Sequence, residues 1–297
     1  MRKIALIVSL VVLIALISGF LLIKNKGSSD DSVVIITTSF PEYDFVRAVT
    51  GEAPKMLLKP GNEIHHFEPT PQDIIDIKSA DFIVYGGGES EEWMDDLLMN
   101  NDIDDSKILS LLDIVEPDLN GDEEDEHVWT SPVSAIEIVE TLRDELSEIW
   151  PEKAEDFKKN TDKYIAELQD IDKEFRAVVD SARTKQLVFA DRFPFYYFAK
   201  EYGLNYVAAF PGCAEQTEAS SKTVAELIDK IKADNLGVVL KIELSNGKLA
   251  DAIANETGAR VMELNSAHNV SQADFDNGVT YVDIMHKNVE VLKEALK

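Results

Sequence analysis

Histidines are the residues of this chain with the clearest capacity for chemistry, because the single cysteine, Cys213, leaves no cysteine-rich metal site within one chain. Four of the five histidines lie in predicted loops beside acidic or turn-forming residues: His65, His66, His127 and His268. Zinc binds a few imidazole nitrogens completed by a carboxylate or water, whereas a carboxylate-rich set favours manganese. Loop histidines in both halves of the chain are therefore candidate ligands for a divalent metal ion, although a solvated side chain is the simpler interpretation of any one of them.

Not every histidine can take part in one site. His65 and His66 are adjacent and cannot easily share an ion, so only one of the two is expected to bind it. His286 falls within a predicted helix and is expected to be a surface or packing residue. The helical HExxH arrangement of zinc hydrolases is absent, and no obvious general base stands beside the histidines. A zinc-dependent hydrolase is therefore the weaker alternative to a binding protein.

The sequence around these histidines alternates between buried strands and helices. This alternation predicts an α/β fold with parallel sheets covered by helices. The expected strands are 33–38, 81–85, 186–190 and 237–242. The expected helices begin at Pro41 and cover about 194–202, 246–257 and 274–296. Ligands of such open sheets bind beyond the carboxyl ends of the strands, so the cleft between two lobes is the predicted site.

A long charged segment divides the two runs of alternation. From 151 to 183 it lacks glycine and carries apolar residues mostly three, four or seven apart, which predicts one amphipathic helix. Such a helix would extend about 45–50 Å, enough to link two lobes, with a bundle or coiled-coil arm as the alternative. The predicted organisation is an N-terminal anchor or signal segment with its linker, a metal-binding lobe, the linking helix and a second metal-binding lobe: 1–32, 33–150, 151–183 and 184–297.

Charge excludes one class of partner. The formal net charge is −27, so binding to nucleic acid through phosphate neutralisation is disfavoured. An acidic surface keeps a protein soluble and also attracts cations. The acidic run 122–126, immediately before His127, is accordingly either a solvated loop or an electrostatic funnel for cations.

The N-terminus predicts attachment to a membrane. Arg2 and Lys3 precede an uncharged run, 4–23, that reaches the about 20 residues needed to span a bilayer. No cysteine follows it, so no lipoprotein attachment site is present, and an uncleaved anchor is the preferred interpretation. Lys24 and Lys26 weaken the charge bias that would place the lobes outside. We expect an extracytoplasmic protein, tethered by or secreted through this segment and joined to it by a flexible linker.

Two motifs carry a resemblance to a known family. The segment PGNEIHHFEPTPQDI, 60–74, resembles the signature of the metal-binding solute receptors of zinc and manganese ABC transporters, with His65 at the ligand position and Phe67 at an aromatic position. The segment EHVWTSP, 126–132, is similar to the second motif of that family and places His127 at its ligand position. The likeness extends over the rest of the chain beyond the anchor.

The resemblance implies a receptor and not an enzyme. It would be a monomer that captures a divalent metal ion, zinc or alternatively manganese, and delivers it to an ABC transporter permease. An added role as an adhesin is compatible with such receptors. The family places a third ligand after the first strand of the second lobe, where one alignment gives Asp191 and another gives Arg192. Arginine stays protonated and cannot bind a metal, so Asp191 is the candidate.

The last ligand of the family lies in the loop after 260–264. In this chain Asn265 is a poor ligand for zinc, whereas His268, in the same loop, is a good one. Glu243, at the end of a predicted strand, is an alternative ligand or a partner of Arg192. The predicted metal site is His65, His127 and His268, closed by Asp191 or water.

Overall fold

The computed structural model describes residues 33–64, 67–101, 103–116, 119–120, 123–212 and 219–297. The chain separates into two units, Met1–Val33 and Val34–Lys297, and the second contains all the helices and strands given below. The predicted N-terminal anchor, His65 and His66 lie outside the described residues. Among the residues that are described, the helices are too short or too polar to span a bilayer.

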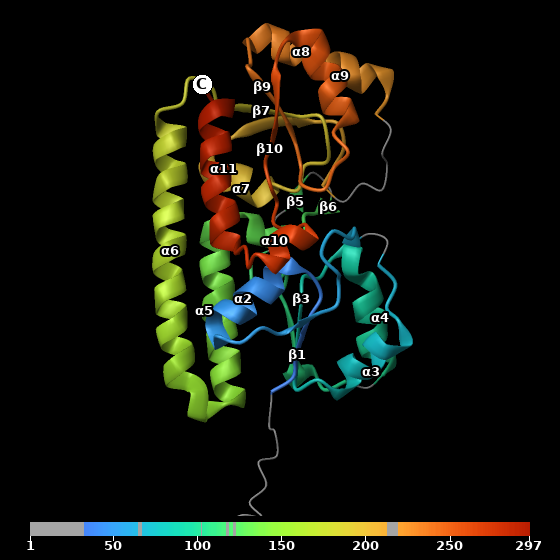
Figure 1. The fold of residues 1–297 in the computed structure, drawn as a ribbon, viewed down its shortest axis with the longest axis vertical. Helices are drawn as coiled ribbons and strands as arrows, with labels where there is room; N and C mark the ends of the chain where they lie inside the picture. The colour runs from blue at the N-terminus through green and yellow to red at the C-terminus, as the bar shows by residue number, and fades with distance from the viewer. Residues whose placement is uncertain (1–32, 65–66, 102, 117–118, 121–122, 213–218) are drawn as a thin grey trace, which may run out of the picture. The chain divides into compact units, whose positions relative to one another are not determined.

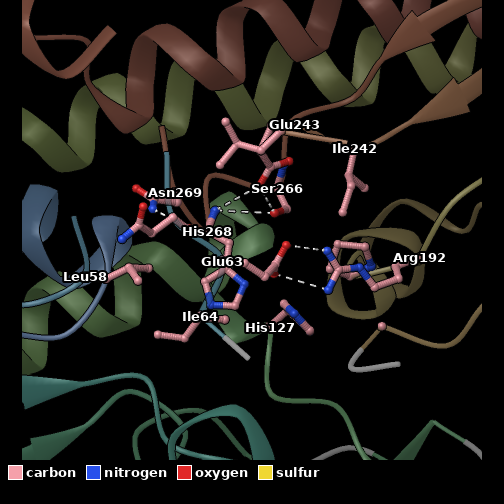
Figure 2. A pocket seen from close by; sticks show the side chains of 14 residues that line it. Leu58, Glu63, Ile64, His127, Arg192, Ile242, Glu243, Ser266, His268 and Asn269 are labelled. Atoms are coloured by element: carbon pink, nitrogen blue, oxygen red, sulfur yellow. Dashed lines mark hydrogen bonds and ion pairs between the residues drawn. The ribbon is translucent and has the colours of Figure 1, made fainter. Parts of the chain in front are cut away.

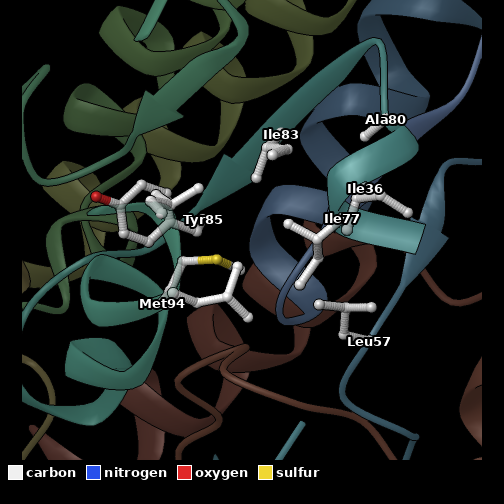
Figure 3. Close-up of a cluster of buried hydrophobic side chains, with 9 residues drawn as sticks. Ile36, Leu57, Ile77, Ala80, Ile83, Tyr85 and Met94 are labelled. Atoms are coloured by element: carbon white, nitrogen blue, oxygen red, sulfur yellow. The ribbon is translucent and has the colours of Figure 1, made fainter. Parts of the chain in front are cut away.

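The N-terminal lobe is built on a parallel four-stranded sheet in the order β2-β1-β3-β4. Its strands are β1 (Ile35–Thr37), β2 (Lys55–Met56), β3 (Phe82–Tyr85) and β4 (Ile108–Ser110). The helices of this lobe include α2 (Phe40–Thr50), α3 (Pro71–Ser79) and α4 (Glu92–Asn100). Strands β1 and β3 are mostly apolar and are buried along their whole length, as expected when helices cover a parallel sheet. Figure 3 shows part of the resulting core, where Ile36, Ile77, Ile83 and Met94 gather.

The C-terminal lobe repeats this plan with a second parallel sheet, in the order β10-β9-β7-β8. Its strands are β7 (Gln186–Phe189), β8 (Asn205–Ala208), β9 (Val238–Lys241) and β10 (Arg260–Glu263). Helices α7 (Tyr196–Tyr202), α8 (Ser221–Asp234) and α9 (Lys248–Thr257) belong to it. Leu227, Ile231, Val239 and Ile253 form the centre of its core.

A helical hairpin joins the two lobes. Helix α5 (Pro132–Ile149) lies beside α6 (Ala154–Asp180) in Figure 1. Helix α6 also packs against α2 of the first lobe and against α11 (Tyr281–Ala295) of the second. It buries one stripe of side chains, as the apolar periodicity predicts. The expected linking helix is therefore present.

The structure confirms the predicted α/β fold with two parallel sheets. The prediction of a single helix over 274–296 is wrong. That region forms α10 (Gln272–Asp276) and α11, separated by Gly278 in a left-handed conformation, φ 71°. Thr280 then caps α11 by accepting a hydrogen bond from the Asp283 amide. The short elements are 3₁₀ turns η2 (Glu89–Glu91), η3 (Asp105–Lys107), η4 (Val128–Thr130) and η5 (Pro151–Lys153), and antiparallel strands β5 (Leu119–Asn120) and β6 (Glu123–Glu124).

Candidate metal centre

His127 is held rigidly at the entrance to η4. Its side chain is 1% exposed, and the helix that follows is fixed by Ser131, which accepts a hydrogen bond from the Ser134 amide. The Asp125 carboxylate accepts hydrogen bonds from the His127 amide at 3.0 Å and from Nδ1 at 3.1 Å. A carboxylate can only accept, so Nδ1 carries a proton, and in the neutral imidazole the lone pair is then on Nε2. His127 is thus prepared to bind a metal ion through Nε2.

His268 is positioned by a buried carboxylate. Glu243, just after β9, accepts hydrogen bonds from the Ser266 amide at 2.8 Å and hydroxyl at 2.5 Å, and from the His268 amide at 3.3 Å. Ala267, which lies between Ser266 and His268, has a left-handed backbone conformation with φ 61°, which costs energy for alanine. Both Glu243 oxygens are used by this loop, so Glu243 acts as the support of His268.

The two imidazoles meet beside a tryptophan. Their ring centroids lie 5.4 Å apart with the planes at 85°. The Trp129 ring lies 5.4 Å from that of His127 and 5.0 Å from that of His268. Trp129 Nε1 donates to the Ser266 carbonyl at 3.0 Å, and Tyr281 donates to the Trp129 carbonyl at 2.7 Å. The tryptophan therefore fixes the spacing of the two histidine loops.

A cavity opens between the lobes at this point. Both histidines line it, together with Glu63 and Ile64 of the first lobe and Arg192 of the second (Figure 2). The two residues that precede His65 therefore face the cavity.

The His268 loop belongs to the second lobe by sequence but is bound to the first. The Asn269 side-chain amide donates to the carbonyls of Lys59 at 3.0 Å and Asn62 at 2.8 Å. The Gly61 amide donates to the Val270 carbonyl at 2.8 Å. These bonds secure the loop that leads to His65 against the loop that carries His268.

Arg192, and not Asp191, lines the cavity. Its guanidinium forms a two-pronged ion pair with Glu63 across the cleft, at 3.2 and 2.9 Å. Burial lowers the pKa of Arg192, but the hydrogen bonds and charge of Glu63 outweigh it, so the pKa is raised. The Asp191 carboxylate accepts from the Arg192 amide at 2.9 Å. Asp191 as a ligand stays a prediction.

Two acidic residues before His127 serve the site in a way that the sequence did not indicate. Asp125 and Glu126 are 5% and 2% exposed, so the end of the acidic run is not a solvated loop. Glu126 accepts a hydrogen bond from the Ser90 amide, and Asp125 orients His127. The position of Asp125 two residues before His127, a predicted ligand, is the signal that could have identified it. Burial lowers the pKa of His127, but the Asp125 charge and hydrogen bond more than compensate and raise it.

The described residues hold only part of the predicted ligand set. They include no group of three or more histidine, cysteine, aspartate or glutamate side chains arranged to hold a metal ion, and His65 lies outside them. The structure does bring His127 and His268 together from the two halves of the chain. His286 lies on α11 with Nδ1 3.5 Å from Glu174, at the surface as expected.

Comparison with known proteins adds independent findings. The family model described as the periplasmic component A of a zinc-uptake complex, ZnuA, matches residues 35–295. The chain is 32% identical over 293 residues to the high-affinity zinc uptake system protein ZnuA of Bacillus subtilis, covering 92% of this chain and 91% of the relative. It is 31% identical over 314 residues to the zinc-binding lipoprotein AdcA of Streptococcus pneumoniae, covering 99% of this chain and 61% of that longer relative.

Solved structures agree with these relatives. The Zn(II)-bound ZnuA-like domain of S. pneumoniae AdcA superposes with a TM-score of 0.78 at 33% identity, over 89% of this chain and 98% of that one. The laminin-binding protein Lmb of Streptococcus agalactiae, described as bifunctional with adhesin and metal transporting activity, gives 0.79 at 27% identity, over 90% and 100%.

Proposed function

The chain belongs to the ZnuA family of periplasmic zinc-uptake components, and on this premise we propose that it captures zinc outside the cytoplasm and delivers it to the permease of an ABC transporter. The observation that carries the proposal is the meeting of the His127 and His268 rings, 5.4 Å apart, in the cavity between the lobes. The family is a transport receptor and not an enzyme, so a zinc hydrolase is set aside.

The proposed ligands are His65, His127 and His268, closed by Asp191 or water. Glu63 and Ile64 line the cavity, which supports a place for the following residue, His65, at the same ion. A set of imidazoles suits zinc, whereas manganese would call for more carboxylate ligands. The relatives named above as zinc proteins support the same metal.

The chain's own residues prepare this site before an ion arrives. Asp125 fixes the His127 ring, and Glu243 fixes the loop of His268. A ligand set that is already ordered pays less conformational entropy on binding. The buried carboxylates also provide negative charge beside a dication, which favours its entry.

Membrane tethering is part of the proposal. The apolar run 4–23 would hold the receptor, as a monomer, at the outer face of the membrane near its permease. The name of the AdcA relative as a lipoprotein supports attachment, although this chain would attach through an apolar segment. The likeness to Lmb, described as an adhesin that also transports metal, keeps an added adhesin role as a second candidate.

Competition titration of the purified 297-residue chain against a chromophoric zinc chelator tests the proposal. His127→Ala and His268→Ala should each weaken zinc binding by about tenfold or more, equivalent to at least about 1.4 kcal/mol. His286→Ala, on the surface of α11, is the matched control and should bind zinc like the parent. A parent chain that takes up no zinc would contradict the proposal, as would a loss confined to the control.

A further inference from the structure

A fixed positive charge in a cation receptor requires an explanation. Arg192 stays protonated and lines the same cavity as His127 and His268. Its charge would repel a dication at the imidazoles, and the repulsion is strong in a site partly withdrawn from water. The Glu63 carboxylate pairs with this guanidinium directly, and the charges of Asp191 and Glu243 also offset it.

The contact between these residues is specific. The two terminal guanidinium nitrogens, Nη1 and Nη2, each donate to one Glu63 oxygen, the paired geometry in which arginine binds carboxylates most tightly. The residues are 129 positions apart and come from different lobes. Figure 2 shows Glu63 on the side of Arg192 that faces His127 and His268.

We propose that Arg192 competes with the bound metal ion for the Glu63 carboxylate, and thereby limits zinc affinity and speeds zinc release. The inference rests on the proposed receptor function. A carboxylate whose two oxygens hold an arginine cannot give them fully to a metal ion. Glu63 is not one of the proposed ligands, but its negative charge can act on either cation. If Glu63 turns toward zinc, Arg192 loses its counter-charge beside a dication, and if Glu63 stays with Arg192, zinc lacks that negative charge. Either outcome weakens the bound state.

The test is whether replacing Arg192 raises or lowers the affinity for zinc. Zinc affinity is measured by chelator competition on the full chain, and zinc release by mixing the loaded protein with excess chelator. Arg192→Gln should bind zinc about tenfold more tightly and release it more slowly, because a charge is removed and Glu63 is freed. Glu63→Gln should bind more weakly, because Arg192 is left without its counter-charge.

Further variants separate charge from structure. The double variant Glu63→Gln/Arg192→Gln should bind zinc more tightly than Glu63→Gln alone. Arg192→Lys keeps the charge and should stay close to the parent. Arg260→Gln breaks an ion pair with Glu294 on the surface of the second lobe and should change neither quantity. Thermal unfolding of each variant confirms that it folds.

Two results would overturn the inference. Weaker binding in Arg192→Gln would mean that the ion pair closes the lobes around the metal, and unchanged binding would mean that the pair does not act on it. Failure of the proposed receptor function would give a different pattern of results. In that case the parent takes up no zinc and His127→Ala makes no difference.

Discussion

Two of the loops by which the second lobe lines the cavity, the His268 loop and the Arg192 loop, are held in contrasting ways. The His268 loop is buried against Glu243 and bound to the first lobe through Asn269 and Val270. The Arg192 loop meets the first lobe at Glu63, whose side chain is 42% exposed. Buried hydrogen bonds to a carboxylate resist opening more than an ion pair that water and salt can reach.

This difference between the loops suits the two tasks of a metal carrier, which are to hold the ion and later to release it. The His268 loop keeps its donor at a fixed distance from His127, so part of the site is in place before binding. Under the proposal above, the Arg192 loop is the part that responds to an arriving or leaving ion. A receptor that must hold its cargo and later surrender it benefits from having these properties on separate loops.

The largest effect is expected when the fixed loop loses its support. Glu243→Ala leaves the Ser266 amide and hydroxyl and the His268 amide without their acceptor. We expect a loss of about 3 kcal/mol in the free energy of unfolding and zinc binding weakened by more than tenfold. Urea unfolding and zinc titration measure both. Glu263→Ala, which breaks a surface pair with Lys241, is the control. If both variants lose the same unfolding free energy and zinc affinity, Glu243 does not hold the His268 loop more firmly than a surface ion pair would.

A loss of about 10- to 100-fold in zinc affinity is expected from Asp125→Asn, because the amide no longer fixes the proton on Nδ1 of His127. The fold should remain, since asparagine is nearly the same size. Asp144→Asn, in an exposed pair with Arg143, serves as the control. If Asp125→Asn binds zinc like the parent, His127 does not depend on this carboxylate.

A smaller effect on zinc affinity is expected at Gly212, where the second lobe approaches His127. A Cβ there would lie 3.3 Å from His127 Cε1 and 3.1 Å from the Phe193 carbonyl oxygen. Gly212→Ala should therefore displace the ring and weaken zinc binding a few-fold. Gly237→Ala, with no atom within 4 Å of the added group, should leave affinity unchanged. The two variants are compared in one titration series, and similar affinities would show that the ring tolerates the displacement.

The smallest effect on zinc is expected at a buried carboxyl pair outside both loops. Burial raises the pKa of Glu42 to about 7, and burial together with the Glu42 charge raises that of Glu91 to about 8. Both exceed the ordinary value of 4.5, so the folded protein binds these protons more tightly than the unfolded chain does. Their contribution to stability is complete below about pH 4.5 and is lost as the pH rises through 7 and 8.

Glu42→Gln should accordingly flatten the fall in unfolding temperature between pH 5 and 9 while leaving zinc affinity at neutral pH nearly unchanged. Thermal unfolding across this pH range measures the slope. A variant with the parent's slope would show that Glu42 does not hold the proton.

The sequence predicted the features that depend on local pattern. Buried strands such as 186–190 and the linking helix follow from periodicity, and the resemblance identified His127 from a short motif. The break between α10 and α11 was also readable, since Gly278 and the Thr280–Asp283 cap mark a helix end and a helix start. The expected single helix overlooked these two signals.

The contacts that the sequence could not predict join residues far apart in the chain. Arg192 was recognised as unable to bind a metal, but its pairing with Glu63 depends on how the lobes close. The burial of Asp125 likewise depends on packing, because an acidic run is ordinarily solvated. Long-range pairing of polar side chains leaves no periodic trace in the sequence.

Trp129 makes the occupancy of this site visible without a label. Its indole ring contacts both His127 and His268 while its Nε1 stays bound to the Ser266 carbonyl. Indole emission depends on the polarity and charge around the ring, and a metal ion bound by those imidazoles would place a positive charge beside the indole. The intrinsic fluorescence of this tryptophan is therefore expected to change when zinc binds or leaves, so the occupancy of the site can be followed without an added probe.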